Sequence, residues 1–98
     1  MELTKLKEGT TLTIALEGRL DTVTAEDLDK ELKESLDGIK ELIFDFEKLD
    51  YITSAGLRVI TNALKVMNRQ GRMVIRNMQP DVKEVFFVTG FLEIIDVE

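Results

Sequence analysis

The chain has 98 residues, of which 13 are basic and 19 acidic, and it contains no histidine, cysteine or tryptophan. Without cysteine, the chain can form no disulfide, thiolate zinc site or cysteine nucleophile. Without histidine, it also lacks the commonest general base and metal ligand. The net charge of -6 also argues against broad binding to nucleic acid or anionic membranes, because both need a basic surface.

The first 20 residues have the pattern of a β-hairpin. Polar and apolar residues alternate over 11–16, which predicts a strand with one buried face. Leu3 and Leu6 indicate a weaker strand before it, and the turn between the two falls at 8–10. The N-terminal part of the chain therefore begins with two antiparallel strands.

A helix and a central strand are predicted next. Thr22 or Thr24 can cap the helix at its N-terminus, and Gly38 can end it. Its apolar stripe, at spacings of four residues, consists of Leu28, Leu32 and Leu36. The almost continuously apolar run 42–46 then predicts a central strand that is covered on both faces.

A second helix and another core strand follow the central strand. The helix opens at 53–56 and runs to about Gln70, where Gly71 ends it. The apolar run 73–75 predicts the strand after it.

The chain closes with a third helix and a last strand. Pro80 suits the first turn of this helix, Thr89 and Gly90 stop it, and 92–95 forms a final strand or extended end. The complete order is β-β-α-β-α-β-α-β, in which strands alternate with helices. This order predicts one α/β domain over 1–98, with a mainly parallel mixed sheet of about five strands and three or four helices.

Charge is distributed unevenly along the chain. Residues 1–50 carry 14 acidic and 7 basic side chains, whereas 51–98 carry 5 and 6, and no acid lies within 51–80. Four cations in this stretch recur at spacings of 7, 4 and 3, which predict a common face, and a fifth follows: Arg58, Lys65, Arg69, Arg72 and Arg76. The face is either simply solvated or a docking surface for an acidic partner.

Two hydroxyl groups, on Thr53 and Ser54, stand where a predicted buried strand leads into a helix. The carboxyl ends of parallel strands and the neighbouring helix N-termini form the usual functional edge of such a sheet. Unpaired N–H groups and the helix dipole would stabilise a phosphate on a hydroxyl there. The same residues can instead be ordinary N-caps, with Gly56 giving room for helix packing, and both interpretations stay open.

Other candidate sites are less specific. Asp21, Asp45 and Asp50 lie near predicted strand ends, where three carboxylates can hold Mg²⁺ or simply cap loops. Three aromatic side chains form either core and rim or a binding box, and these are Phe86, Phe87 and Phe91. Glycine-rich phosphate loops are absent, and we expect no catalytic residue, no cofactor and no bound metal.

The segment 49–60 resembles the signature of the STAS domain family, specifically of bacterial anti-sigma factor antagonists. The typical pattern is a hydrophobic pair, then Asp, Ser or Thr, then Ser, then Ser or Ala, Gly and Leu, and 51–57 matches it as YITSAGL. Three further blocks match in the usual order: 18–21, 43–46 and 85–91. The resemblance covers nearly the whole chain.

The resemblance implies a non-enzymatic regulator of transcription that works by partner switching. The unphosphorylated protein would bind an anti-sigma factor that is a serine kinase, and would thereby release the sigma factor. Phosphorylation of Ser54 would weaken this binding, and a metal-dependent serine phosphatase would restore it. The position before Ser54, often aspartate in the family, is Thr53, which offers a second hydroxyl.

The expected partner surface surrounds this serine and comprises Thr53, Gly56, Arg58, Asp21 and Thr22. Within the same fold, an alternative function is that of the STAS subunit of a lipid-transport ABC complex, docked by the same helix to the nucleotide-binding subunit. No signal peptide or membrane span is recognisable. We therefore expect a cytoplasmic protein, without direct nucleic acid contact or membrane insertion.

Overall fold

Five strands and three α-helices, in the order β-β-α-β-α-β-α-β, make up the computed structural model, which describes residues 1–98. A short 3-10 helix, η1, precedes the last strand. The elements are β1 (Glu2–Glu8), β2 (Thr11–Leu20), α1 (Thr22–Ser35), β3 (Glu41–Ile52), α2 (Ser54–Gln70), β4 (Arg72–Arg76), α3 (Pro80–Val88), η1 (Phe91–Glu93) and β5 (Asp96–Val97). The predicted fold class and element order are confirmed.

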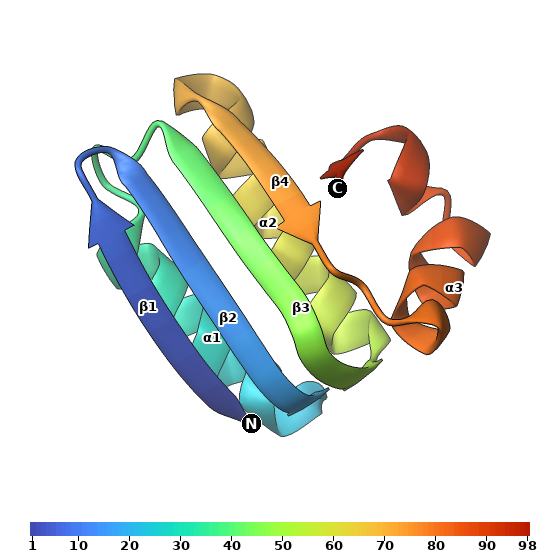
Figure 1. Cartoon of the computed structure of the whole chain (residues 1–98). Coiled ribbons are helices and arrows are strands. Elements are labelled where there is room, and N and C mark those ends of the chain that lie inside the picture. Colours follow the sequence, from blue (N-terminus) through green and yellow to red (C-terminus); the bar gives the residue numbers. More distant parts are fainter.

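The strands form one mixed sheet in the order β1-β2-β3-β4-β5 (Figure 1). β1 pairs antiparallel with β2 as a hairpin, and the other three pairs are parallel. Between parallel strands the chain returns through a helix, so the carboxyl ends of β2 and β3 lie at the same end of the sheet. Leu20 and Ile52 are register partners there. The N-termini of α1 and α2 therefore begin next to each other.

α1 and α2 lie against the same face of the sheet and contact each other (Figure 1). Their apolar residues join those of the strands in one core cluster of 25 buried residues. α3 joins this core at its edge, where the rings of Phe86 and Phe46 are 6.2 Å apart between centroids. The apolar stripes predicted from the sequence therefore point into the same core.

The central strand β3 is covered by helices on one face only, so the prediction of cover on both faces is wrong. Leu42, Phe44 and Phe46 belong to the core cluster on the helix side. Ile43 and Val74 are register partners that are also buried, but they lie outside this cluster on the open face. Neighbouring strands bury this pair, which explains why the run 42–46 is apolar without a second helical layer.

α1 differs from its prediction at both ends. Its N-cap is Asp21, so that Thr22 is the first helical residue and Thr24 the third. Its C-cap is Leu36, two residues before the expected stop at Gly38. The aspartate carboxylate accepts two backbone N–H groups and therefore takes the role that was expected of a threonine hydroxyl.

The junction between α2 and β4 is tightly packed. α2 ends at Gln70 as predicted, and a Cβ atom on Gly71 would lie 1.8 Å from the carbonyl oxygen of Lys40. Only glycine fits this approach of two backbone segments. Because the chain turns here, Arg72 lies in β4. The prediction that Arg72 shares a helix face with the three cations of α2 is therefore wrong.

The C-terminal segment is more irregular than the expected strand at 92–95. Gly90 has a φ of 79°, which suits glycine in the left-handed region and turns the chain out of α3. The 3-10 turn at Phe91–Glu93 follows, and only Asp96–Val97 pairs with β4. None of the helices combines the length and apolar character needed to cross a membrane.

Candidate functional site at the N-termini of the first two helices

Thr53 and Ser54 differ in how their hydroxyl groups are used. Thr53 is the N-cap of α2, and its Oγ1 accepts a hydrogen bond from the N–H of Gly56 at 3.4 Å. The same hydroxyl lies 3.5 Å from the carbonyl oxygen of Leu20, to which it donates. Ser54 is the first helical residue, is exposed, and forms no side-chain hydrogen bond with the rest of the chain. The accessible hydroxyl at this helix end is therefore that of Ser54.

Backbone pairing fixes this helix end to the sheet. The N–H of Thr53 donates to the carbonyl of Leu20 at 3.0 Å, which ties the start of α2 to the end of β2. The N–H groups of Ser54 and Ala55 are the first two of α2 and have no acceptor within the helix. Ser54 is thus held at a rigid position beside free N–H groups.

The N-terminus of α2 carries no carboxylate, unlike those of the other two helices. α1 is capped by Asp21, and α3 has Asp81 in its first turn. α2 has no acidic residue in its first turn and is capped by a neutral threonine. The positive end of its dipole is therefore uncompensated and favours an added negative charge.

Gly56 lies inside the protein, and this location corrects its expected place on the partner surface. A Cβ atom at Gly56 would lie 2.8 Å from Cγ of Leu20 and 2.9 Å from Cγ1 of Ile52. The glycine therefore lets α2 approach the ends of β2 and β3 closely. Its contribution to the site is to position Ser54, and it presents no side chain to a partner.

Asp21 and Thr22 begin α1 beside α2. Oδ1 of Asp21 accepts hydrogen bonds from the N–H groups of Val23 and Thr24, both at 3.1 Å. The N–H of Asp21 in turn donates to Oγ1 of Thr24 at 2.8 Å, which completes a capping box. The backbone hydrogen bond from Thr24, which outweighs the opposing effect of desolvation, lowers the pKa of Asp21. Asp21 thus acts as a structural cap, while Thr22 is exposed.

Arg58 and Thr22 are brought together although 36 positions separate them. Both line a shallow hollow of about 190 Å³ between α1 and α2, together with Ala55, which follows Ser54 directly. Arg58 is exposed, and its guanidinium forms no ion pair within the chain. The structure therefore joins Ser54, Thr22 and Arg58 on one accessible surface.

The structure adds Arg19 and Tyr51 to this end of the sheet, which the sequence prediction missed. They are register partners on β2 and β3, and the guanidinium of Arg19 lies 4.2 Å from the centroid of the Tyr51 ring. Tyr51 remains 44% exposed. The signal in the sequence was a tyrosine two positions before the helix cap, but its partner could be found only from the strand register.

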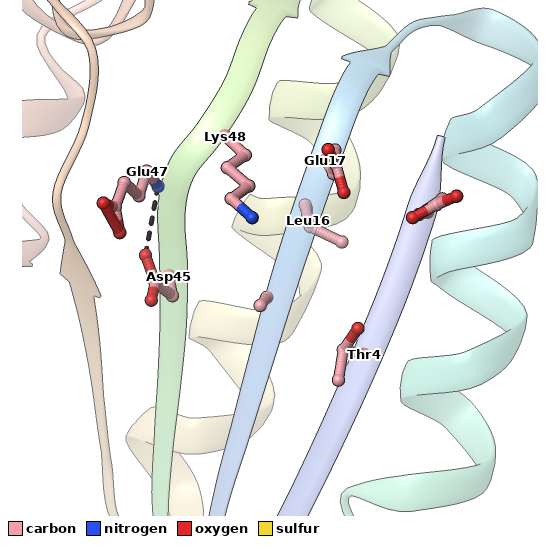
Figure 2. A pocket seen from close by; sticks show the side chains of 8 residues that line it. Thr4, Leu16, Glu17, Asp45, Glu47 and Lys48 are labelled. Carbon is pink, nitrogen blue, oxygen red and sulfur yellow. Dashed lines mark hydrogen bonds between the residues drawn. The ribbon is translucent and has the colours of Figure 1, made fainter.

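The three aspartates considered for Mg²⁺ do not gather. Asp21 caps α1, while Oδ1 of Asp45 accepts from the N–H of Glu47 at 3.0 Å and from Nδ2 of Asn77 at 3.3 Å. Asp50 accepts from Nε2 of Gln79 at 3.2 Å. Figure 2 shows Asp45 on β3, in a hollow of the open sheet face. No three acidic side chains are grouped so that they can hold a metal ion. Asp21 and Asp45 accept backbone N–H groups, as the capping interpretation predicts, whereas Asp50 accepts from a side chain.

The three phenylalanines also have separate roles. Phe86 is fully buried, and its ring lies 6.2 Å from that of Phe91, which is half-buried. Phe87 is 66% exposed. The interpretation as core and rim therefore holds for Phe86 and Phe91, while Phe87 lies on the surface, where it lines a shallow hollow with Leu92.

The sequence of this chain matches a family model and a known protein over nearly its whole length. The family model for the STAS domain matches residues 3–98. BtrV of Bordetella bronchiseptica, named as a candidate anti-sigma factor antagonist, is 39% identical over 99 residues, which cover 99% of this chain and 85% of that protein.

Solved structures agree in fold. An anti-sigma factor antagonist from Mycobacterium paratuberculosis has a TM-score of 0.88 at 15% identity, over 98% of this chain and 83% of that one. SpoIIAA matches in its unphosphorylated form, with a TM-score of 0.79 at 19% identity over 99% of this chain and 87% of that one. The phosphorylated Bacillus form matches with 0.78 at 20% identity, over 99% and 91%. The chain belongs to the STAS domain family.

Proposed function

We propose that this protein is an anti-sigma factor antagonist whose Ser54 is the phosphoacceptor of a partner switch. In its unphosphorylated form it binds an anti-sigma factor with serine kinase activity and releases the sigma factor. Phosphorylation of Ser54 weakens this binding, and a serine phosphatase restores it. The relatives named as anti-sigma factor antagonists support the partner class.

The observation that carries the proposal is the free hydroxyl of Ser54 at an uncompensated helix N-terminus. A kinase can reach this hydroxyl because it is exposed and the residues beside it are small. Thr53 offers a second hydroxyl, but that group already bonds to Gly56 and Leu20. The geometry therefore favours Ser54 over Thr53 as the acceptor.

A phosphate on Ser54 would change the surface and leave the fold intact. It adds about -1.5 to -2 charges and three acceptor oxygens at the positive end of α2. The helix end favours this charge, whereas a partner surface fitted to a neutral hydroxyl would have to accommodate a dianion. The similar match of this chain to both forms of SpoIIAA supports a switch without refolding.

The experiment is a phosphorylation assay with peptide mass spectrometry. The protein is incubated with a cognate serine-kinase anti-sigma factor and ATP, beside the variants Ser54→Ala and Thr53→Val. We expect one phosphate on Ser54, which is lost in Ser54→Ala and retained in Thr53→Val. Ser35→Ala is the matched control, because Ser35 is the only other serine and its hydroxyl is already bonded to Lys5 and Glu31.

Absence of phosphate on Ser54, with a kinase shown to be active on another antagonist, would overturn the proposal. Stable binding to the nucleotide-binding subunit of a lipid-transport ABC complex, without any phosphorylation, would instead support the alternative STAS function. The two functions are distinguishable, since the first requires phosphoryl transfer from ATP to Ser54 and the second does not.

A further inference from the structure

A continuous groove runs between α1 and α2 along the outer surface of the protein. Its first part, of about 190 Å³, begins at Thr22 and Ala55, and its second part, of about 430 Å³, ends at Asp37 and Gln70. Asp29 and Asn62 line both parts and join them. At 1.5 Å per helical residue the groove is about 20 Å long, which is the length of a helix of about four turns.

The floor of the wider part of the groove is apolar, and the two helices bury most of it between them. Leu32 of α1 and the C-cap residue Leu36 line this part together with Ala63 and Val66 of α2. Val66 is 38% exposed although it is a large apolar residue on a helix. The two helices thus leave an apolar seam on their outer side, where a third helix can pack.

The two walls of the groove differ in charge. On the α2 side, Arg58 lines the groove. Lys65 and Arg69 are also exposed and follow it at spacings of 7 and 4, which put the three cations on one stripe of the helix, beside the lining residues of α2. None of these cations forms an ion pair within the chain. The α1 side is lined by three carboxylates and one ammonium group: Glu26, Asp29, Asp37 and Lys33. Lys33 pairs with Asp29 at 2.9 Å, so the α1 wall keeps a net negative charge.

We propose that this groove receives an amphipathic helix of a partner protein. The helix places apolar residues on the floor, an acidic edge against the basic border of α2, and a basic edge against α1. In helix-in-groove binding of this kind, the apolar anchors provide the affinity and the charged edges provide the specificity for the partner. Since the groove begins beside Ser54, the bound helix also brings its protein against that residue, and this last link rests on the proposed function.

The test uses two synthetic 16-residue helical peptides with the same leucine stripe. One carries glutamate along one edge and lysine along the other, and the second carries lysine along both edges. Binding is followed by amide chemical shifts of the labelled full chain. We expect the mixed-edge peptide to bind at least about threefold more tightly than the all-lysine peptide, an effect kept modest because exposed ion pairs contribute little individually. The chemical shift changes should lie along α1 and α2.

Charge variants of two exposed asparagines on α2 provide the matched control. Asn62 lines the groove and Asn68 does not. Asn62→Glu should weaken binding of the mixed-edge peptide by about threefold or more, whereas Asn62→Lys and Asn68→Glu should leave it unchanged or stronger. The wild-type comparison of the two peptides remains decisive if a variant is unstable.

Equal affinity for the two peptides, equal effects of Asn62→Glu and Asn68→Glu, or no binding would each overturn the proposal. It would also be overturned by a dimer in which the groove is covered by a second copy of this chain. None of these measurements uses the kinase or ATP. Failure of the groove and failure of Ser54 phosphorylation are therefore distinguishable.

Discussion

Thr53 and Ser54 are adjacent, but their hydroxyl groups have different surroundings. The Thr53 hydroxyl donates to the carbonyl of Leu20 in β2 and accepts from the N–H of Gly56 in α2, while the Ser54 hydroxyl is exposed to solvent. Sequence reasoning could not separate them, because either residue type can cap a helix. The distinction depends on where the helix begins, which is set by the pairing of Thr53 with Leu20.

Gly56→Ala should destabilise the protein. An added methyl group would press against Leu20 and Ile52, and such overpacking costs about 1–3 kcal/mol. Alanine gains up to about 1 kcal/mol over glycine in helix propensity, which offsets only part of this cost. Urea unfolding should therefore show a net loss of about 1 kcal/mol.

The control for Gly56→Ala is Asn68→Ala, which introduces the same residue at an exposed position of the same helix. It should be neutral or slightly stabilising, because it changes helix propensity alone. An unchanged or raised unfolding midpoint for Gly56→Ala would contradict the close packing of α2 on the sheet.

Asp21→Asn should reveal the pH dependence of the α1 cap. Because the pKa of Asp21 is lowered in the folded state, its carboxylate stabilises the fold at pH values above the unfolded pKa of about 3.9. This contribution is lost as the pH falls through the folded-state pKa. Asparagine can cap a helix without titrating, but it lacks the charge that interacts with the helix dipole. Wild type should therefore exceed the variant in stability at pH 7 and lose this advantage as the pH falls through the lowered folded-state pKa.

The measurement is urea unfolding of both proteins across that pH range. Asp27→Asn serves as the control, because it removes an exposed carboxylate that accepts no hydrogen bond within the chain. A difference between wild type and Asp21→Asn that is constant with pH would show that the carboxylate does not stabilise the cap.

Among the helices, α2 is the one whose N-terminus has no negative charge. α1 and α3 each have an aspartate at the cap or in the first turn. Helix boundaries at α2 were predictable because its hydroxyl cap, apolar stripe and closing glycine agree. The α1 boundary was mispredicted because three side chains at 21–24 can all cap, and the choice depends on the capping box that forms with Thr24.

Ser54→Asp should stabilise α2. A carboxylate at the first helical position interacts favourably with the dipole by about 0.3–1 kcal/mol at low salt. Thermal unfolding should show a higher midpoint than wild type, and the gain should shrink as salt is added.

Asn68→Asp places the same charge in the last turn of the same helix and should lower the midpoint. If Ser54→Asp and Asn68→Asp shifted stability in the same direction, the electrostatic account of this helix end would be wrong.

The alternation of strands and helices along the chain was sufficient to predict the sheet and its mainly parallel pairing. It could not show that both α1 and α2 cover the same face, because the apolar run of β3 is equally consistent with two covered faces. The burial of Ile43 against Val74 on the open face depends on register, which no local pattern contains. The juxtaposition of Thr22, Ala55 and Arg58 is likewise a result of packing.

The switch proposed at Ser54 is that a single phosphate changes what the surface binds and leaves the fold unchanged. It is tested most directly by measuring the affinity of the phosphorylated and unphosphorylated protein for the cognate anti-sigma factor, together with amide spectra of both forms. We predict a loss of affinity of at least about tenfold, or about 1.4 kcal/mol. Spectral changes should be confined to the N-termini of α1 and α2. Equal affinities, or spectral changes throughout the sheet, would contradict the account.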